Sequence, residues 1–157
     1  MQAPKLSVDI YIAGEYTEIV KTKKKMLIIL DNGAVTKTIT EYIAAAFGTA
    51  PFENWSATVI SAKDFSPTQL LPAHAFLLGC EKPNLPEFTD IKELLKHINL
   101  AGRPCGVFSS QLSAVKYLSG LVRDSEAALG SPLVVENGAV DGRKLKKWVG
   151  SIIGDKL

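Results

Sequence analysis

The stretch MLIILDNG, residues 26–33, decides the fold class of this chain. Its first five residues form an unbroken apolar run, which is typical of a strand covered on both faces, as in parallel sheets. Asp31-Asn32-Gly33 supplies turn residues that end the strand. Thr38 and Glu41 have the spacing of a capping box for a following helix, and Gly48 is placed to stop it. Apolar residues at helical spacing predict that helix: Ile39, Tyr42, Ile43, Ala46 and Phe47.

The same alternation of strand and helix continues to the end of the chain. Short apolar runs predict further strands at 55–61, 73–79, 104–108 and 132–136. Helices are predicted between and after them: a short one at 66–71, one across 91–98, a longer one from 114 to 129, and a last one across 145–152. The short helix begins with the capping pattern Ser66-Pro67-Thr68-Gln69 and is stopped by Pro72. This alternation favours an α/β fold, a three-layer doubly wound sheet of five parallel strands with helices on both faces.

Residues 1–23 have a different pattern and predict an N-terminal β-hairpin extension, with the α/β domain at 24–157. Leu6, Val8, Ile10 and Ile12 recur at every second position, and Ala13-Gly14 can turn the chain into a second strand. An isolated hairpin is marginally stable in water, and each exposed apolar side chain forfeits roughly 1.5–3 kcal/mol relative to full burial. We therefore expect residues 5–20 to pack against the body of the domain or a second copy of the chain.

The composition excludes several classes of protein. With 157 residues, 46% hydrophobic and 22% charged, the chain matches one globular domain. A net charge of +2 is too small to predict a nucleic-acid partner. No apolar run approaches the roughly 20 residues that span a bilayer, and the first residues lack a secretory-signal pattern, so we expect no membrane partner and a cytoplasmic location. Two cysteines without a zinc pattern predict no metal site.

Sequence motifs of common enzyme classes are absent. The chain has no G-x-x-x-x-G-K-[ST] phosphate loop, no G-x-G-x-x-G dinucleotide fingerprint and no G-x-S-x-G nucleophile elbow. Neither cysteine begins a Cys-x5-Arg phosphatase loop. Only Asp31 follows the first α/β strand and Gly79-Cys80 ends the third, so the acidic residues of a response-regulator receiver are missing. We expect an electron carrier or a binding domain rather than a catalyst with its own active site.

Three loops are the candidate ligand-binding segments. In open parallel sheets, ligands bind outside the carboxyl ends of the strands where the strand order reverses. The predicted fold places loops 31–37, 79–88 and 109–114 there. Cys80 should lie at the end of one strand and Cys105 at the start of its neighbour. Because that separation exceeds the reach of a disulfide, both thiols are expected to be unpaired.

From about Lys24 to Ile153 the chain resembles the flavodoxin family, including the flavodoxin domain of A-type flavoproteins. The resemblance rests on element order and on three stretches: ATVISAKDFSPTQLLPAHAFLLGCEKP (57–83), LKHINLAGRPCGVFSS (95–110) and LGSPLVVENGAVDGRKLKKWV (129–149). It implies the strand order 2-1-3-4-5 and one-electron transfer through non-covalently bound FMN. The FMN phosphate would lie on the first loop and the isoalloxazine ring between the other two.

The resemblance also assigns cofactor-binding positions. The phosphate positions are Asn32, Gly33, Ala34, Val35 and Thr36. The flavin-ring positions are Gly79, Cys80, Ser109, Ser110 and Gln111.

These loops depart from the family pattern. The family's phosphate loop reads [ST]-x-T-G-x-[ST], and only Thr36 keeps its type in the matching stretch. Asp31 would bring a carboxylate toward a phosphate dianion, a repulsion of about 1 kcal/mol or more. Asp31→Ser or Asp31→Thr is therefore expected to strengthen FMN binding. The aromatic residues that usually cover the flavin are also missing from the other two loops, which removes stacking energy.

Two functions are compatible with this sequence. The first is FMN-mediated electron transfer with weakened or lost FMN binding, which implies a redox partner protein. The alternative is a non-redox binding or scaffold module that keeps the flavodoxin fold without a cofactor, with self-association as one mode of binding. Fold alone does not choose between them.

Overall fold

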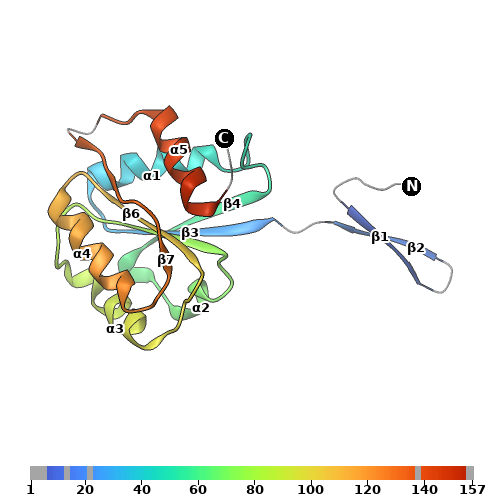
Figure 1. Ribbon diagram of the computed structural model, residues 1–157, viewed down its shortest axis with the longest axis horizontal. Coiled ribbons are helices and arrows are strands. Elements are labelled where there is room, and N and C mark those ends of the chain that lie inside the picture. The colour runs from blue at the N-terminus through green and yellow to red at the C-terminus, as the bar shows by residue number, and fades with distance from the viewer. Residues whose placement is uncertain (1–6, 13–14, 21–22, 137–138, 155–157) are drawn as a thin grey trace.

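The computed structural model describes residues 7–12, 15–20, 23–136 and 139–154 (Figure 1). The predicted N-terminal hairpin is present: β1 (Ser7–Ile12) and β2 (Glu15–Val20) pair antiparallel, with Val8 opposite Ile19. Figure 1 shows this hairpin to one side of the α/β body. Packing of the hairpin on the body of its own chain or on a second copy remains a prediction.

The body is built on a parallel sheet with β3 near its centre. β3 (Lys24–Leu30) pairs in parallel with β4 (Trp55–Ser61) and with β5 (Ala75–Gly79), which in turn pairs with β6 (Pro104–Ser109). Two short strands, β7 (Ala128–Leu129) and β8 (Leu133–Val134), both pair with β6. The strands of the body therefore follow the predicted order 2-1-3-4-5, with β7 and β8 sharing the fifth position.

The fifth strand of the sheet is divided between β7 and β8, whereas the sequence predicted one strand at 132–136. Gly130 donates its N–H to the Cys105 carbonyl at the end of β7, and pairing resumes only at Leu133. Pro132 has no N–H to donate to a ladder, which explains the interruption. The helix predicted to reach residue 129 is also shorter. It ends at Arg123, because Glu126 has a left-handed backbone (φ 63°) that breaks helical geometry.

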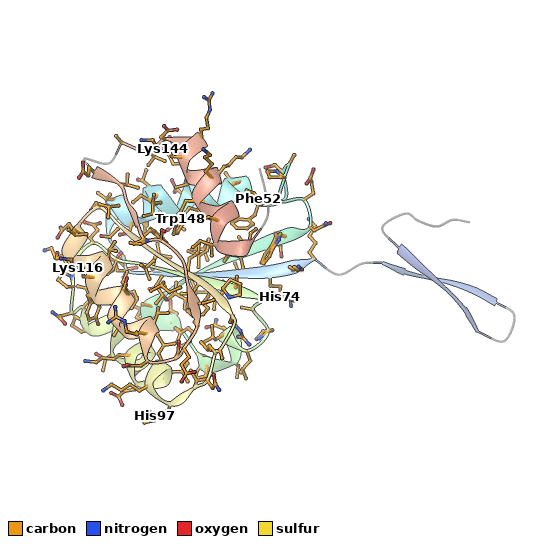
Figure 2. The ribbon with its side chains drawn as sticks, viewed as in Figure 1. Phe52, His74, His97, Lys116, Lys144 and Trp148 are labelled. Carbon is orange, nitrogen blue, oxygen red and sulfur yellow. The ribbon has the colours of Figure 1, made fainter. Side chains whose placement is uncertain are left out.

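Helices cover both faces of the sheet. The helices α1 (Ala34–Ala46) and α5 (Gly142–Ile153) pack on one face, and Figure 2 shows Trp148 of α5 on that side of the molecule. The opposite face carries α2 (Pro67–Leu70), α3 (Thr89–His97) and α4 (Leu112–Arg123), with the short 3-10 turns η1 (Ala62–Asp64) and η2 (Pro86–Phe88). The predicted three-layer arrangement is therefore confirmed.

Two helix starts were predicted from capping patterns, with opposite outcomes. The capping box at Ser66 and Gln69 is confirmed, since Gln69 Oε1 accepts from the Ser66 N–H at 2.7 Å and Ser66 Oγ accepts from the Thr68 N–H. The box predicted at Thr38 and Glu41 is wrong. Helix α1 begins at Ala34, and the Thr38 hydroxyl donates to the Ala34 carbonyl inside the helix. The polar contacts that start α1 come from another loop, as described below.

Helix α5 offers a test of a cap that stabilises the helix layer. Asp141 Oδ1 accepts from the N–H groups of Arg143 at 3.0 Å and Lys144 at 3.3 Å. We expect Asp141→Ala to lower the free energy of unfolding by about 1 kcal/mol, because these N–H groups lose their acceptor. Asp141→Asn keeps an acceptor and should stay close to the wild type. Urea denaturation of the three proteins measures the difference, and equal midpoints for all of them would contradict the capping role.

Candidate functional site

The carboxyl ends of β3 and β5 bring two of the predicted loops into contact. The Asp31 N–H donates to the Gly79 carbonyl at 3.2 Å, so the segment after β3 lies directly beside the segment after β5. The first loop is also shorter than predicted, because α1 begins at Ala34. Ala34, Val35 and Thr36 therefore lie in the first turn of a helix, where free N–H groups and the helix dipole favour an anion.

Asp31 holds these two loops together. Its side chain is buried, with 4% of its surface exposed. Oδ1 accepts from the Gly33 N–H at 3.2 Å and Oδ2 accepts from the Glu81 N–H at 2.9 Å. Bonds of this kind to a carboxylate are stronger than bonds between neutral groups. The sequence predicted Asp31 as a turn residue and as a charge facing a phosphate, whereas the structure gives it two hydrogen bonds within the protein.

The Glu81 carboxylate lies at the start of α1. Its Oε2 accepts from the Val35 N–H at 3.0 Å, at the second residue of the helix. A Cβ atom at Gly33 would overlap this carboxylate, so the absence of a side chain at Gly33 makes room for Glu81. An internal carboxylate thus uses the helix N-terminus to which the flavodoxin resemblance assigns the FMN phosphate. Glu81 is not distinguished in the sequence, because its role depends on the meeting of two loops.

An FMN phosphate does not fit this arrangement of side chains. It would have to replace Glu81 at the Val35 N–H, beside the Asp31 carboxylate that already uses the Gly33 N–H. Two unit charges at 4 Å repel by about 4 kcal/mol at an effective dielectric constant near 20. One group favours an anion: the buried Thr36 hydroxyl has no hydrogen-bond partner among the described residues. The two carboxylates outweigh this single hydroxyl.

Most of the residues assigned to the flavin ring are buried or contact other residues of the protein. Gly79 lies against the ring of Phe108, which a Cβ at residue 79 would overlap. Phe108 is fully buried and meets Trp148 edge-on, with ring centroids 6.1 Å apart. Ser109 is buried, and its hydroxyl accepts from the Gln111 N–H at 3.0 Å. Ser110 is half-buried and Gln111 is exposed. The assignment of these positions to a flavin remains a prediction.

Both cysteines are buried and unpaired, as predicted. Burial raises the pKa of the Cys80 thiol to about 12, with the Asp31 and Glu87 carboxylates adding to the shift. Burial also raises the pKa of Cys105 well above its ordinary value. Neither thiol has the lowered pKa of a reactive cysteine, so the environment of Cys80 is that of a core residue.

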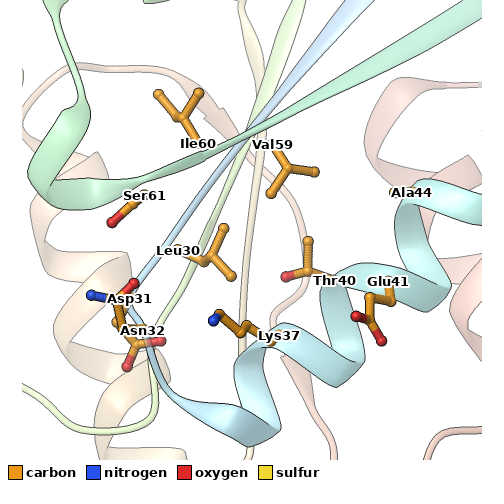
Figure 3. Close-up of a pocket in the computed structure, with 10 residues that line it drawn as sticks. All are labelled: Leu30, Asp31, Asn32, Lys37, Thr40, Glu41, Ala44, Val59, Ile60 and Ser61. Carbon is orange, nitrogen blue, oxygen red and sulfur yellow. The ribbon is translucent and has the colours of Figure 1, made fainter.

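A cavity of about 440 Å³ opens between α1 and β4, and Asp31 and Asn32 of the first loop form part of its wall (Figure 3). Its polar groups include the Thr40 and Ser61 hydroxyls, which are buried and have no hydrogen-bond partner among the described residues. Sequence analysis did not predict this cavity. The residues that line it are Leu30, Asp31, Asn32, Lys37, Thr40, Glu41, Ala44, Val59, Ile60 and Ser61.

The described residues give no sign of a metal centre or a membrane span. They contain no group of three or more histidine, cysteine, aspartate or glutamate side chains placed to hold a metal ion. None of the helices in the described ranges has the length and apolar character needed to cross a membrane.

Comparison with solved structures shows a flavodoxin-like fold. A flavodoxin from Streptococcus pneumonia TIGR4 superposes with a TM-score of 0.70 and 16% identity, over 83% of this chain and 97% of that one. Oxidised flavodoxin 2 from Bacillus cereus gives 0.66 and 20%, over 82% and 95%. The phosphorylated cyanobacterial phytochrome response regulator RcpA gives 0.53 and 15%, over 84% and 95%. Neither protein-family models nor curated protein sequences gave a match.

The pKa of Cys80 leads to a testable prediction. At pH 8 a thiol with a pKa of about 12 is ionised about a thousandfold less than one with a pKa near 9. We expect a thiol reagent to label the native protein at least about a hundredfold more slowly than the urea-unfolded protein. Labelling of the native protein should accelerate as the pH rises toward 10. A native thiol that reacts at the unfolded rate at pH 8 would contradict this account.

Asp31 provides a second test at this site. Asp31→Ser was expected to strengthen FMN binding by removing a charge, and that effect remains a prediction. The hydrogen bonds to Gly33 and Glu81 add a cost, because the shorter serine cannot accept from both N–H groups. We expect Asp31→Ser to lower the free energy of unfolding by about 1–3 kcal/mol. Denaturant titration measures this loss, and an unchanged stability would show that these two bonds contribute little.

Proposed function

We propose that this chain is a non-redox binding module that keeps a flavodoxin-like fold without FMN. The observation that supports this function is the contact between Glu81 Oε2 and the Val35 N–H at 3.0 Å. This carboxylate supplies the negative charge that the start of a helix attracts, and so competes directly with a phosphate. Asp31 adds to the competition, because it takes the Gly33 N–H and holds the Glu81 backbone close to the helix.

FMN-mediated electron transfer is the second candidate. The buried Thr36 hydroxyl without a described partner favours it, since phosphate is a strong acceptor. This function needs Glu81 to leave the helix start before the cofactor enters. It also needs a partner redox protein and a flavin held without aromatic stacking.

The non-redox module is expected to act in the cytoplasm through protein contacts, including contacts between copies of the chain.

FMN titration of the purified protein tests the proposed function. We expect the wild type to be colourless and to bind added FMN with a Kd weaker than about 1 mM, since the phosphate must displace Glu81. Glu81→Gln should tighten binding at least about tenfold, because it removes a charge next to the incoming phosphate. Glu87→Gln is the matched control. It removes the same charge from the same loop, at a carboxylate that has no hydrogen bond to the start of α1 among the described residues.

A second variant displaces Glu81 without changing it. Gly33 has an extended backbone (φ −68°, ψ 141°) that alanine also adopts, so Gly33→Ala puts a methyl group where the carboxylate lies. Because the methyl group also lies where the phosphate would bind, this variant should bind FMN no more tightly than the wild type, in contrast to Glu81→Gln. A yellow wild-type protein, or micromolar binding by the wild type, would overturn the proposal and favour the electron carrier. Equal affinities in all four proteins would show that Glu81 does not decide FMN binding.

A further inference from the structure

Strand β4 forms an edge of the sheet with unpaired backbone groups. It pairs with β3, and no strand in the described ranges pairs with its other side. The Lys24 N–H donates to the Asn54 carbonyl at 2.8 Å, so the even-numbered residues face β3. By the alternation of a parallel ladder, the N–H and C=O groups of Ala57 and Val59 point away from the sheet. These groups can pair with an incoming strand.

The sequence of β4 does not protect this edge. Natural edge strands commonly carry lysine, proline or a bulge that prevents pairing with another chain. Strand β4 reads WSATVIS and contains no charged residue and no proline. Its seven residues pair in unbroken register with β3, so the strand has no bulge. The edge is therefore open to β-strand addition.

The cavity between α1 and β4 runs along this edge. Val59 lies in its wall and leaves 44% of its surface exposed, although it is a large apolar residue. Figure 3 shows Val59 and Thr40 facing each other across the gap between β4 and α1. The Thr40 side chain is only 3% exposed, yet its hydroxyl has no hydrogen-bond partner among the described residues. An edge strand with an apolar wall and an unsatisfied polar group beside it has the features of a docking surface.

The N-terminal hairpin has complementary features. Strands β1 and β2 have six residues each, close to the seven of β4. Apolar residues alternate with polar ones along β1, and the register pairs Val8 with Ile19, Ile10 with Thr17 and Ile12 with Glu15. A two-stranded ribbon is marginally stable alone, and Figure 1 shows this one beside the body rather than on it.

We propose that the β4 edge and its neighbouring cavity bind the N-terminal hairpin of a second copy of this chain by β-strand addition. One hairpin strand pairs with the backbone of Ala57 and Val59, and the alternating apolar residues of β1 cover the exposed Val59 side chain. When each copy gives its hairpin to the other, the two contacts are identical and the dimer is closed. Asp31 also lines the cavity, but Ala57, Val59 and the hairpin lie outside the Glu81 contact, and the proposal does not depend on whether FMN binds.

Sedimentation equilibrium of the full chain tests the exchange. The wild type should be a dimer. Val59→Lys should weaken dimerisation at least about tenfold, because it places a charge in the docking surface. Ala101→Lys is the matched control: it adds the same charge at an exposed residue in the turn before β6, away from β4, and should dimerise like the wild type. Ile10→Lys should weaken dimerisation as Val59→Lys does, whereas Ser7→Lys on the other face of the hairpin should not.

Mixing the two disruptive variants distinguishes an exchanged hairpin from other contacts. A Val59→Lys chain has an intact hairpin and an Ile10→Lys chain has an intact edge, so the mixture should form dimers with one intact contact. Association of the mixture that exceeds that of either variant alone would support the proposal. A monomeric wild type would overturn it, as would dimerisation that Val59→Lys weakens and Ile10→Lys leaves intact, since that result indicates direct edge-to-edge pairing of two β4 strands. Far-UV circular dichroism checks that each variant is folded.

Discussion

Burial of β3 on both faces is the constraint on which the rest of this structure depends. Every side chain from Met26 to Leu30 is at most 5% exposed. Met26 and Ile28 contribute to the core beneath α1 and α5, whereas Leu27 and Ile29 contribute to the core on the opposite face. Each burial contributes roughly 1.5–3 kcal/mol, while the net stability of a whole domain is only roughly 5–15 kcal/mol. A strand of this kind needs a helix layer on each side, so its position dictates the three-layer architecture and the edge at which the loops meet.

Local patterns predicted the parts of the fold that local chemistry determines. The strands at 26–30 and 55–61 and the capping box at Ser66 follow from neighbouring residues, and the structure confirms them. The prediction of a helix beyond Arg123 was wrong, because the structure of that segment depends on residues distant in the sequence. Its short strand β7 exists because the Ala128 and Gly130 N–H groups donate to carbonyls of Arg103 and Cys105, partners distant in the sequence. Apolar spacing alone cannot distinguish such a strand from the continuation of a helix.

At the candidate site too, the sequence of each loop predicts its position, but contacts between loops could not be predicted. The resemblance to flavodoxins pointed to these loops, and the departure of the first loop from the family pattern drew attention to Asp31. The role of Asp31 as a hydrogen-bond acceptor for two loops requires knowing that Gly79 and Glu81 lie beside it. Glu81 itself is an ordinary loop acid in the sequence. Only its contact with the Val35 N–H distinguishes it from the other acids of that loop.

The split fifth position of the sheet limits how this protein can assemble. Strands β7 and β8 contribute two residues each, with Pro132 between them. An incoming strand would find only short, interrupted ladders on that side, in the part of the chain that the structure describes. A sheet with two open edges can propagate from molecule to molecule into a fibre, whereas a sheet with a single open edge cannot extend past its first contact. The interruption at Pro132 therefore protects this side of the sheet from edge-to-edge pairing, and leaves β4 as the edge that is open to an incoming strand.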